Sequence, residues 1–413
     1  MSCPHCCEDA KFVGYRVCRP TCLFGKIVYE RAYYYCRHCK SGWFPTDAEF
    51  GIEDHQTRGA REVISLLGVL EPFGPSAQQI LPRLTGLKVS ASTVQRTTES
   101  VGEDVARRRA ESETFGAHAP RVTSEHFSDD SAPKSSFRDQ LIQASPAHEA
   151  WEWNVDASGR RVAYVGLDAT GVPQQGPQGE KAECRMPWVG LVFNPQPAGQ
   201  KRRRRIWETR YVAGLMSLDE IGQQLRAECQ AVDVSRADVV IGLTDGGNGL
   251  ENCLVSVLGG IAGEIVFILD FYHASEHLLE FAKVLCRDDE ARQQQTQAWC
   301  HTLKHEGGQS LLRELKARDM TRASPQAWEA HRQLLGYLRN NQHRMDYPTY
   351  ISNGWQIGSG MVEAACKTVV CQRLKESGMR WREHGTTALS QLRALYKSEP
   401  KLWKNYWNRT LCP

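Results

Sequence analysis

The sequence lacks a long hydrophobic run. No apolar run reaches the roughly 18 residues of a membrane-spanning helix, and the first residues lack the apolar core of a signal peptide. The net charge is also small, +3 over 413 residues, so any nucleic-acid partner must be inferred from local clusters of charge. With 41% hydrophobic and 24% charged residues, the composition is that of a globular protein of two or three domains. We therefore expect a cytoplasmic protein with no membrane partner.

Cysteine, in contrast, is concentrated at the N-terminus, where seven of the 15 cysteines lie within the first 39 residues. Disulfides are rare in the cytosol, so this cluster indicates metal binding. Two Cys-x-x-Cys pairs flank the strand-forming stretch 27–35, and four thiolates form the tetrahedral set that Zn²⁺ prefers. The sequence predicts a zinc ribbon over residues 1–50 with structural Zn²⁺ on Cys3, Cys6, Cys36 and Cys39. It leaves open whether three further thiols take part, namely Cys7, Cys18 and Cys22.

The next segment, residues 51–115, has helical apolar spacing and is predicted to be a DNA-binding region. A turn at Gly86 precedes a second helix, for which Ser90 or Ser92 is the expected N-cap. This pattern is similar to a helix-turn-helix, although an ordinary helical hairpin would look the same. The residues expected to contact DNA are Arg83, Ser92, Thr93, Gln95 and Arg96. Residues 116–150 have no sustained period and are predicted to be a linker.

From residue 151 onward, strands and helices alternate. We expect strands over 161–167, 188–193, 206–212, 239–243 and 264–269, with helices beginning after Ser217 and over 250–258. This order, βββαβαβ, is that of an RNase H-like domain. The predicted fold is therefore multidomain α/β: a zinc ribbon, a helix-turn-helix-like region and an RNase H-like catalytic domain. The last is expected over 151–273 and 351–413, interrupted by an all-helical insertion over 274–350.

Three acidic residues suggest a metal centre in this domain. Asp168 and Asp245 each follow an apolar run, and the two runs are expected to be neighbouring strands. Glu363 lies in a helical stretch near the C-terminus. An isolated Asp after a strand is commonly a turn former, but the joint arrangement favours catalysis. Carboxylate oxygens suit two Mg²⁺ or Mn²⁺ ions, which promote the cutting and joining of phosphodiester bonds.

Further residues compete with this triad or support it. Asp270 also ends a strand and is the alternative to Asp245. With His273 it could order the site as an accessory pair, or simply fix the junction between strand and helix. Lys367, one helical turn after Glu363, could contact a DNA phosphate or form an ion pair with that residue.

Basic and aromatic residues suggest contacts with nucleic acid, although a basic run is also typical of a solvated loop. The cations expected to contact DNA are Lys201, Arg202, Arg203, Arg204, Arg373 and Arg380. The C-terminal tail from Lys397 to Arg409 mixes cations with aromatic residues. Trp299 and Trp355 could stack on an unpaired base or belong to the core.

Four stretches that carry the acids resemble one family: 165–172, 243–249, 270–278 and 357–370. They are similar to ISKra-type insertion-sequence transposases, which are bacterial DDE enzymes related to the Mutator-like branch, and the resemblance covers the whole chain. It implies that Asp168, Asp245 and Glu363 are the catalytic acids. It also implies that Asp270 and His273 match an element that follows the second acid in Mutator-like relatives.

The resemblance further implies Mg²⁺-dependent cleavage at insertion-sequence ends and strand transfer into target DNA. Terminal inverted repeats and target DNA would be the partners of a homodimer or larger assembly, bound to the bacterial nucleoid. One alternative is an RNase H-like nuclease or junction resolvase that cuts without joining. Another is a non-catalytic DNA-binding regulator derived from a transposase.

Overall fold

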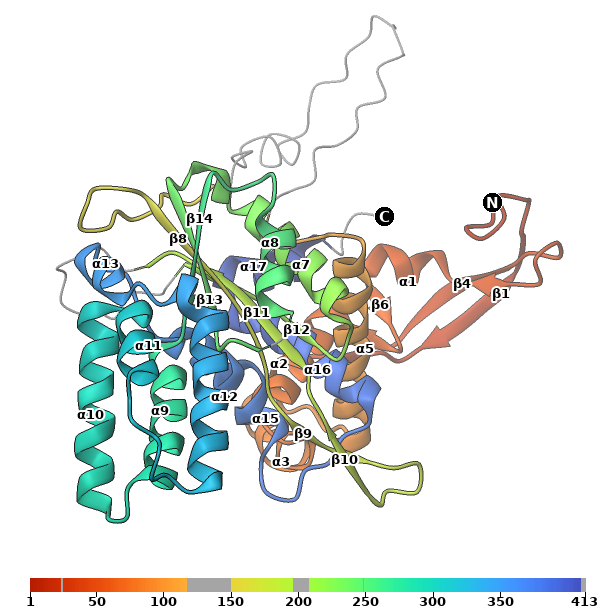
Figure 1. Cartoon of the computed structure of the whole chain (residues 1–413). Coiled ribbons are helices and arrows are strands. Elements are labelled where there is room, and N and C mark those ends of the chain that lie inside the picture. The colour runs from red at the N-terminus through yellow and green to blue at the C-terminus, as the bar shows by residue number, and fades with distance from the viewer. Residues whose placement is uncertain (24, 117–149, 196–207, 248, 410–413) are drawn as a thin grey trace, which may run out of the picture.

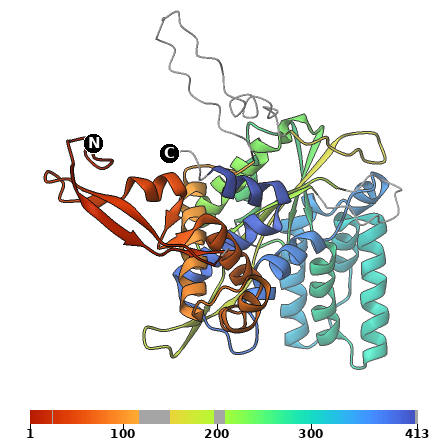
Figure 2. The ribbon, with the colours of Figure 1, turned by 180° about the vertical axis from the view of Figure 1, so that it is seen from behind.

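The computed structural model describes the chain except for residues 24, 117–149, 196–207, 248 and 410–413. The predicted linker, apart from its ends, and the basic run at Lys201–Arg204 lie outside the described residues. The fold is mixed α/β, as the sequence predicted. Figures 1 and 2 show a central sheet with the N-terminal ribbon on one side and a group of long helices on the other.

The N-terminal ribbon consists of two small sheets. In the first, β1 (Lys11–Cys18) pairs antiparallel with β4 (Tyr29–Tyr35), and β4 pairs with β5 (Gly42–Trp43). The second has the order β3-β2-β7-β6. Its strands and the nearby helix are β2 (Thr21–Cys22), β3 (Gly25–Lys26), α1 (Pro45–Phe50), β6 (Ile52–Glu53) and β7 (Gln56–Thr57). The last two strands correct the expectation that residues from 51 onward are helical.

Helices follow directly after β7. They are α2 (Arg58–Leu70), α3 (Phe73–Pro75), the π-helix η1 (Ser76–Ile80), α4 (Leu81–Thr85) and α5 (Ala91–Ala110). Gly86 ends α4 with a φ of 72°, a left-handed conformation that glycine adopts without strain. Ser90 is the N-cap of α5, since its hydroxyl accepts a hydrogen bond from the backbone N–H of Thr93 at 3.1 Å. The rest of α5 packs against α2 and against α16 (Glu383–Lys397).

The central sheet has five strands in the described part of the chain, in the order β12-β11-β8-β13-β14. They are β8 (Val162–Ala169), β11 (Trp188–Phe193), β12 (Thr209–Gly214), β13 (Val239–Thr244) and β14 (Glu264–Leu269). β13 runs parallel to β8 and β14, while β11 runs antiparallel to β8 and β12. β8 is longer than predicted because pairing with β11 continues to Ala169, so Asp168 lies within the strand.

Alternating side chains of the sheet form two buried clusters. Val165 and Leu167 belong to the cluster beneath α7 (Leu218–Ala231) and α8 (Leu250–Leu258). Val162 and Tyr164 belong to the cluster on the other face, which includes α14 (Gly360–Ala365) and the π-helix η4 (Cys366–Cys371). Burial of each such side chain contributes about 1.5–3 kcal/mol. The sheet is therefore covered on both faces.

The helices between β14 and the C-terminal segment cover one end of this second cluster. They are α9 (Phe271–Leu285), α10 (Asp289–Glu306), α11 (Gly308–Lys316), α12 (Pro325–Asn341), the 3₁₀ turn η3 (Gln342–Arg344) and α13 (Tyr347–Ser352). Trp299 is fully buried and stacks on Phe281, with ring centroids 5.3 Å apart. Trp355 is also buried, and its indole N–H donates to Asp156 at 3.0 Å. Both tryptophans are core residues, so neither is free to stack on a base.

Two further features were not predicted from the sequence. A hairpin of β9 (Val172–Gln175) and β10 (Lys181–Arg185) extends from the end of β8. The basic tail is not free: after α15 (Gln372–Leu374) and α16, it forms α17 (Pro400–Arg409), whose Trp403, Tyr406 and Trp407 are buried against α2 and α5.

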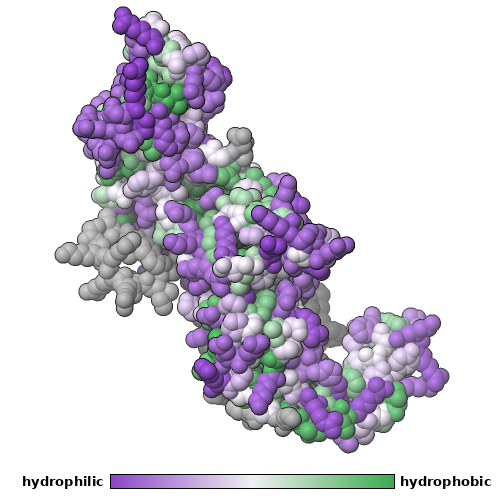
Figure 3. All heavy atoms as spheres, turned by 90° about the horizontal axis from the view of Figure 1, so that it is seen from below, coloured by the Kyte–Doolittle hydropathy of each residue, from purple (hydrophilic) through white to green (hydrophobic). Residues whose placement is uncertain are grey.

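The outer surface is mixed in character. On the face seen in Figure 3, hydrophobic side chains form small separate patches among hydrophilic ones. Among the described residues, no helix combines the length and the apolar character needed to cross a membrane.

Candidate functional site

The four predicted zinc ligands form a compact sulfur cluster in the ribbon. The sulfurs of Cys3 and Cys39 lie 3.5 Å apart, those of Cys6 and Cys36 lie 3.6 Å apart, and all four lie within 4.8 Å of one another. A tetrahedral site with Zn–S bonds of about 2.3 Å places its sulfurs about 3.8 Å apart. The cluster therefore fits a structural metal such as zinc.

Local backbone geometry holds these thiols in place. Cys3 Sγ accepts the backbone N–H of His5 at 3.5 Å, and the backbone N–H of Cys36 donates to Ser41 at 2.8 Å. Hydrogen bonding with Ser41 lowers the pKa of the Cys39 thiol to about 6. A backbone hydrogen bond from Glu8 lowers the pKa of the Cys6 thiol, but burial and the neighbouring thiols outweigh it and raise this pKa to about 12. The sulfur cluster does not include the three thiols left open by the sequence, Cys7, Cys18 and Cys22.

The register of the central sheet brings Asp168 and Asp245 together. Leu243 of β13 pairs with Gly166 of the parallel strand β8. Asp245, just after β13, and Asp168 each lie two residues further along the chain, so the two residues are level with each other. Side chains alternate along a strand, and Leu243 belongs to the cluster that contains Val362 of α14. Both carboxylates therefore lie at one end of the sheet, on the face covered by α14.

Glu363 approaches these acids from α14. The burial of Asp168 raises the pKa of its carboxyl group, a hydrogen bond from the Ala169 N–H opposes this shift, and the charges of Asp245 and Glu363 raise the pKa further. Asp245 and Glu363 are thus both within electrostatic reach of Asp168. In the described part of the chain, however, only the four thiols form a ligand group within 4.8 Å. The three acids do not form such a group, and the Glu363 side chain is exposed.

The loop that carries Asp245 is held by its own hydrogen bonds. Asp245 Oδ1 accepts the backbone N–H of Gly247 at 2.8 Å, and Gly246 has a φ of 90°, which favours glycine. Arg344 lies beneath this loop; its buried guanidinium donates to Thr244 Oγ1 at 3.0 Å and pairs with Glu251 at 3.1 Å. Arg344 was not predicted, because nothing in the local sequence of a helical insertion indicates which loop it contacts.

Asp270, the competitor, is occupied by other hydrogen bonds. Its Oδ1 accepts the N–H of Tyr272 at 2.7 Å and caps α9, and its Oδ2 accepts the hydroxyl of Ser359 just before α14. The backbone N–H of Phe271 also donates to Ile357 at 2.8 Å. These contacts connect the start of α9 to the loop that leads to Glu363.

The contacts of the other accessory residues are local, apart from one that involves Lys375. His273 Nδ1 is 3.5 Å from Glu276, and its ring lies edge-on to that of His277, with ring centroids 5.0 Å apart. Lys367 is exposed, and within the described residues no ion pair joins it to Glu363. Lys375, whose contact was not predicted, donates to Thr170 Oγ1 at 2.8 Å, two residues after Asp168.

The predicted DNA contacts fall into three groups. Arg83, Ser92, Gln95, Arg96 and Arg380 are exposed, and Thr93 is half-buried at the start of α5. Lys201, Arg202, Arg203 and Arg204 lie outside the described residues. Arg373 does not lie on the surface: its side chain is fully buried, and its Nε donates to the Gly68 carbonyl at 3.0 Å, so it cannot contact a duplex on the surface.

A comparison with protein-family models and with curated proteins finds no match for this chain.

Proposed function

We propose that this chain is a DDE transposase, which cuts DNA at insertion-sequence ends and transfers the freed strand into target DNA. The observation that carries the proposal is the parallel register of β8 and β13, because it sets Asp168 beside Asp245 beneath the helix that carries Glu363. An RNase H-like fold for this domain is supported by the strand order β12-β11-β8-β13-β14, with antiparallel β11 and β12 and parallel β8, β13 and β14.

The donor set suits hard divalent cations. Asp168, Asp245 and Glu363 offer only carboxylate oxygens, which fit Mg²⁺ or Mn²⁺. When bound, two such ions would activate a water or 3′-hydroxyl nucleophile and stabilise the leaving oxygen. Zinc on the ribbon would have only a structural role.

The protein's own residues prepare this site. Asp168 is rigid because it lies within a paired strand, and Arg344 fixes the base of the Asp245 loop through Thr244. Lys367 and Lys375 place positive charge beside the acids, where the phosphates of a bound strand would lie. The exposed start of α5 would recognise the DNA ends. Synapsis of two ends would require at least a dimer.

The test uses a plasmid that carries the gene with its native flanking DNA, together with pre-cut end fragments. We expect Mg²⁺-dependent cleavage and joined products from the wild type, none with EDTA, and none from Asp168→Asn, which should still bind the ends. The control Asp219→Asn changes an exposed carboxylate of α7 and should retain full activity.

Other outcomes assign the alternatives. Cleavage without joined products would identify a nuclease or resolvase. End binding with no cleavage by the wild type would favour a regulator. Full activity of Asp168→Asn would refute the proposed metal centre.

A further inference from the structure

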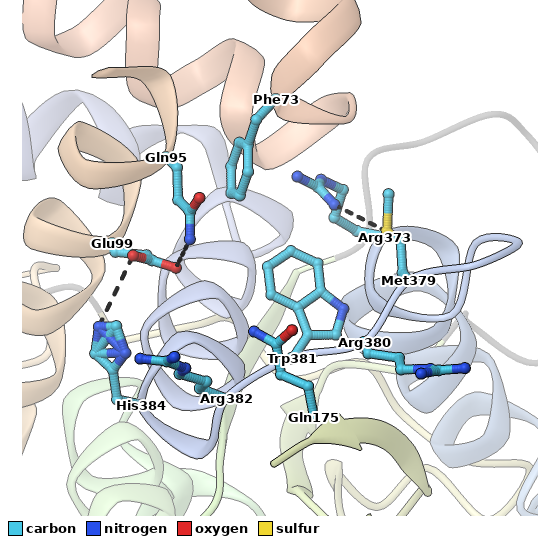
Figure 4. Close-up of a pocket in the computed structure, with 10 residues that line it drawn as sticks. All are labelled: Phe73, Gln95, Glu99, Gln175, Arg373, Met379, Arg380, Trp381, Arg382 and His384. Carbon is cyan, nitrogen blue, oxygen red and sulfur yellow. Dashed lines mark hydrogen bonds and ion pairs between the residues drawn. The ribbon is translucent and has the colours of Figure 1, made fainter. Parts of the chain in front are cut away.

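A cavity of about 460 Å³ lies between the helical region and the segment that follows η4. Its lining includes Phe73 of α3, Gln95 of α5, Gln175 of β9 and Trp381 (Figure 4). This volume is within the range of small-molecule sites, roughly 300–1,000 Å³. Neither the acidic centre nor the sulfur cluster contributes to it.

Arg373 contributes to the cavity wall a buried side chain with one unpaired hydrogen-bond donor. The side chain is completely buried; its Nε donates to the Gly68 carbonyl at 3.0 Å and its Nη1 lies 3.4 Å from the Met379 sulfur. Its Nη2 is buried without a hydrogen-bond partner, and no carboxylate of the described residues forms a salt bridge with Arg373. Buried donors are nearly always paired. An anionic acceptor in the cavity would complete this site.

The surrounding charges favour an anion as well. Arg380 and Arg382 lie on either side of Trp381 in Figure 4, and His384 lies nearby. The one carboxylate of the lining, Glu99, is already engaged: it accepts from Gln95 at 3.0 Å and lies 3.8 Å from His384. The cavity therefore has excess positive charge.

Flat apolar groups stand beside this charge. Phe73 packs edge-on against Trp381 at 5.9 Å, and the Arg373 guanidinium lies 4.7 Å from the Phe73 ring centroid. Gln95 and Gln175 add amide groups of the kind that pair with base edges. Together these groups are complementary to a phosphate that is joined to a nucleobase.

A short path connects the cavity to the acids. The backbone N–H of Gln175 donates to Trp381 at 2.8 Å, and the backbone N–H of Trp381 donates to Pro173 at 3.0 Å. β9 follows β8 directly, so about seven residues of extended chain, at most about 24 Å, separate Gln175 from Asp168. Lys375, two residues after Arg373, contacts Thr170 between these points.

We propose that this cavity holds one unpaired nucleotide of a DNA strand that passes the carboxylates. The proposal rests on the proposed function, because it assumes that DNA is the substrate. The nucleotide's phosphate would accept from Arg373 and from the rim arginines, and its base would lie against Phe73 and Trp381. Trp299 and Trp355 do not line this cavity, whereas Trp381, although as buried as Trp355, forms part of its wall.

The test is DNA binding in EDTA, measured by fluorescence anisotropy with a short labelled single strand and with a blunt duplex of the same sequence. The double variant Arg380→Gln/Arg382→Gln should weaken single-strand binding roughly tenfold and lower its salt slope by about 1 to 1.5, because two phosphate contacts are lost. Duplex binding should change by less than about threefold. Arg236→Gln, which alters an exposed arginine near the opposite end of β13, is the matched control and should bind like the wild type.

Arg373→Lys tests the buried group, because it keeps the positive charge and removes the unsatisfied N–H. It should weaken single-strand binding selectively; if it fails to fold, the rim variant alone decides. Equal losses on single strand and duplex, or no loss on either, would overturn the proposal. A competition experiment gives a further outcome that would overturn the proposal. If free dAMP displaces the labelled strand at the same concentration as unlabelled single strand does, the cavity is a mononucleotide site. Cleavage is not measured, so failure here is separate from failure of the acidic centre.

Discussion

Val362 packs directly against Gly166, and a Cβ atom added at Gly166 would lie 2.5 Å from Cγ2 of Val362. The same added atom would lie 3.2 Å from Cδ2 of Leu191, so the space beneath the helix is full. Because Glu363 follows Val362 in α14, the contact between Val362 and Gly166 determines how closely the Glu363 backbone approaches β8, the strand that carries Asp168. Glycine at position 166 is therefore required for the close approach of α14 to β8.

Gly166→Ala should lower both stability and activity. Overpacking of a filled core costs about 1–3 kcal/mol in free energy of unfolding, and Val362 cannot yield easily because its β-branched side chain is stiff. The displaced helix should reduce Mg²⁺-dependent cleavage by about 100-fold, since small misplacements of catalytic groups are costly. Urea denaturation and the plasmid assay measure the two effects.

Two further variants distinguish the clash with Val362 from a general effect of adding a methyl group near α14. Gly360→Ala adds a methyl group to the same helix where nothing lies within 4 Å, so it should retain activity. Gly166→Ala combined with Val362→Ala should recover much of the lost cleavage. Full activity of Gly166→Ala alone would show that this contact does not position Glu363.

Much of the central sheet could be predicted from the sequence because its strands are buried on both faces and are therefore continuous apolar runs. β14 has the predicted bounds, and β13 extends one residue further. The predicted capping box is also present: Ser217 Oγ accepts from the Glu220 N–H at 3.2 Å, and Glu220 accepts from the Ser217 N–H at 2.8 Å. The hairpin of β9 and β10 was missed because its strands are short and mostly polar, and β9 depends on pairing with the distant Trp381.

Asp168→Asn should stabilise the protein in EDTA, with a defined pH dependence. Burial and the charges of Asp245 and Glu363 raise the folded-state pKa of Asp168 above its ordinary value of 3.8. Well below pH 3.8 this carboxyl group is protonated in both the folded and the unfolded state, so it does not lower the free energy of unfolding. As the pH rises, the unfolded chain releases its proton first, so wild-type stability falls until the folded-state pKa has been passed.

The advantage of Asp168→Asn in free energy of unfolding should therefore appear above pH 3.8 and reach a plateau at higher pH. Chemical denaturation in EDTA over a series of pH values measures it. Saturating Mg²⁺ should reverse the order, because the ion binds folded wild type and not the variant. A variant that is less stable than the wild type across this range in EDTA would contradict the prediction.

Asp270→Ser should lower cleavage activity only in part, because the hydrogen bond from Ser359 is lost while the cap of α9 remains, whereas Asp245→Asn should abolish it. Serine can still cap α9 through the Tyr272 N–H, so the fold should lose at most about 1 kcal/mol, but serine does not replace a carboxylate metal ligand. Plasmid cleavage and thermal unfolding of both variants distinguish the two roles. Complete loss of cleavage with an unchanged melting temperature in Asp270→Ser would make Asp270 the second ligand instead.

The candidate site was only partly accessible from the sequence. Asp168 and Asp245 could be placed side by side because strand order determines which strand ends meet. Arg373 was expected on the surface because a cation in a polar segment is typically exposed, whereas its side chain is completely buried and bonded to Gly68 of α2. The hydrogen bond from Arg344 to Thr244 joins residues that are far apart in the chain, and a local sequence pattern cannot predict such a contact.

Cys36→Ser should release the ribbon metal, while Cys7→Ser should leave it bound. Cys36 is buried within the sulfur cluster, whereas Cys7 is exposed and outside it. Elemental analysis should find about one Zn²⁺ per chain in the wild type and in Cys7→Ser, and much less in Cys36→Ser. Because a ribbon this small has little core of its own, loss of zinc should unfold it and raise its sensitivity to proteolysis. A wild-type ribbon that is metal-free and still resists protease would contradict this assignment, as would equal zinc content in the two variants.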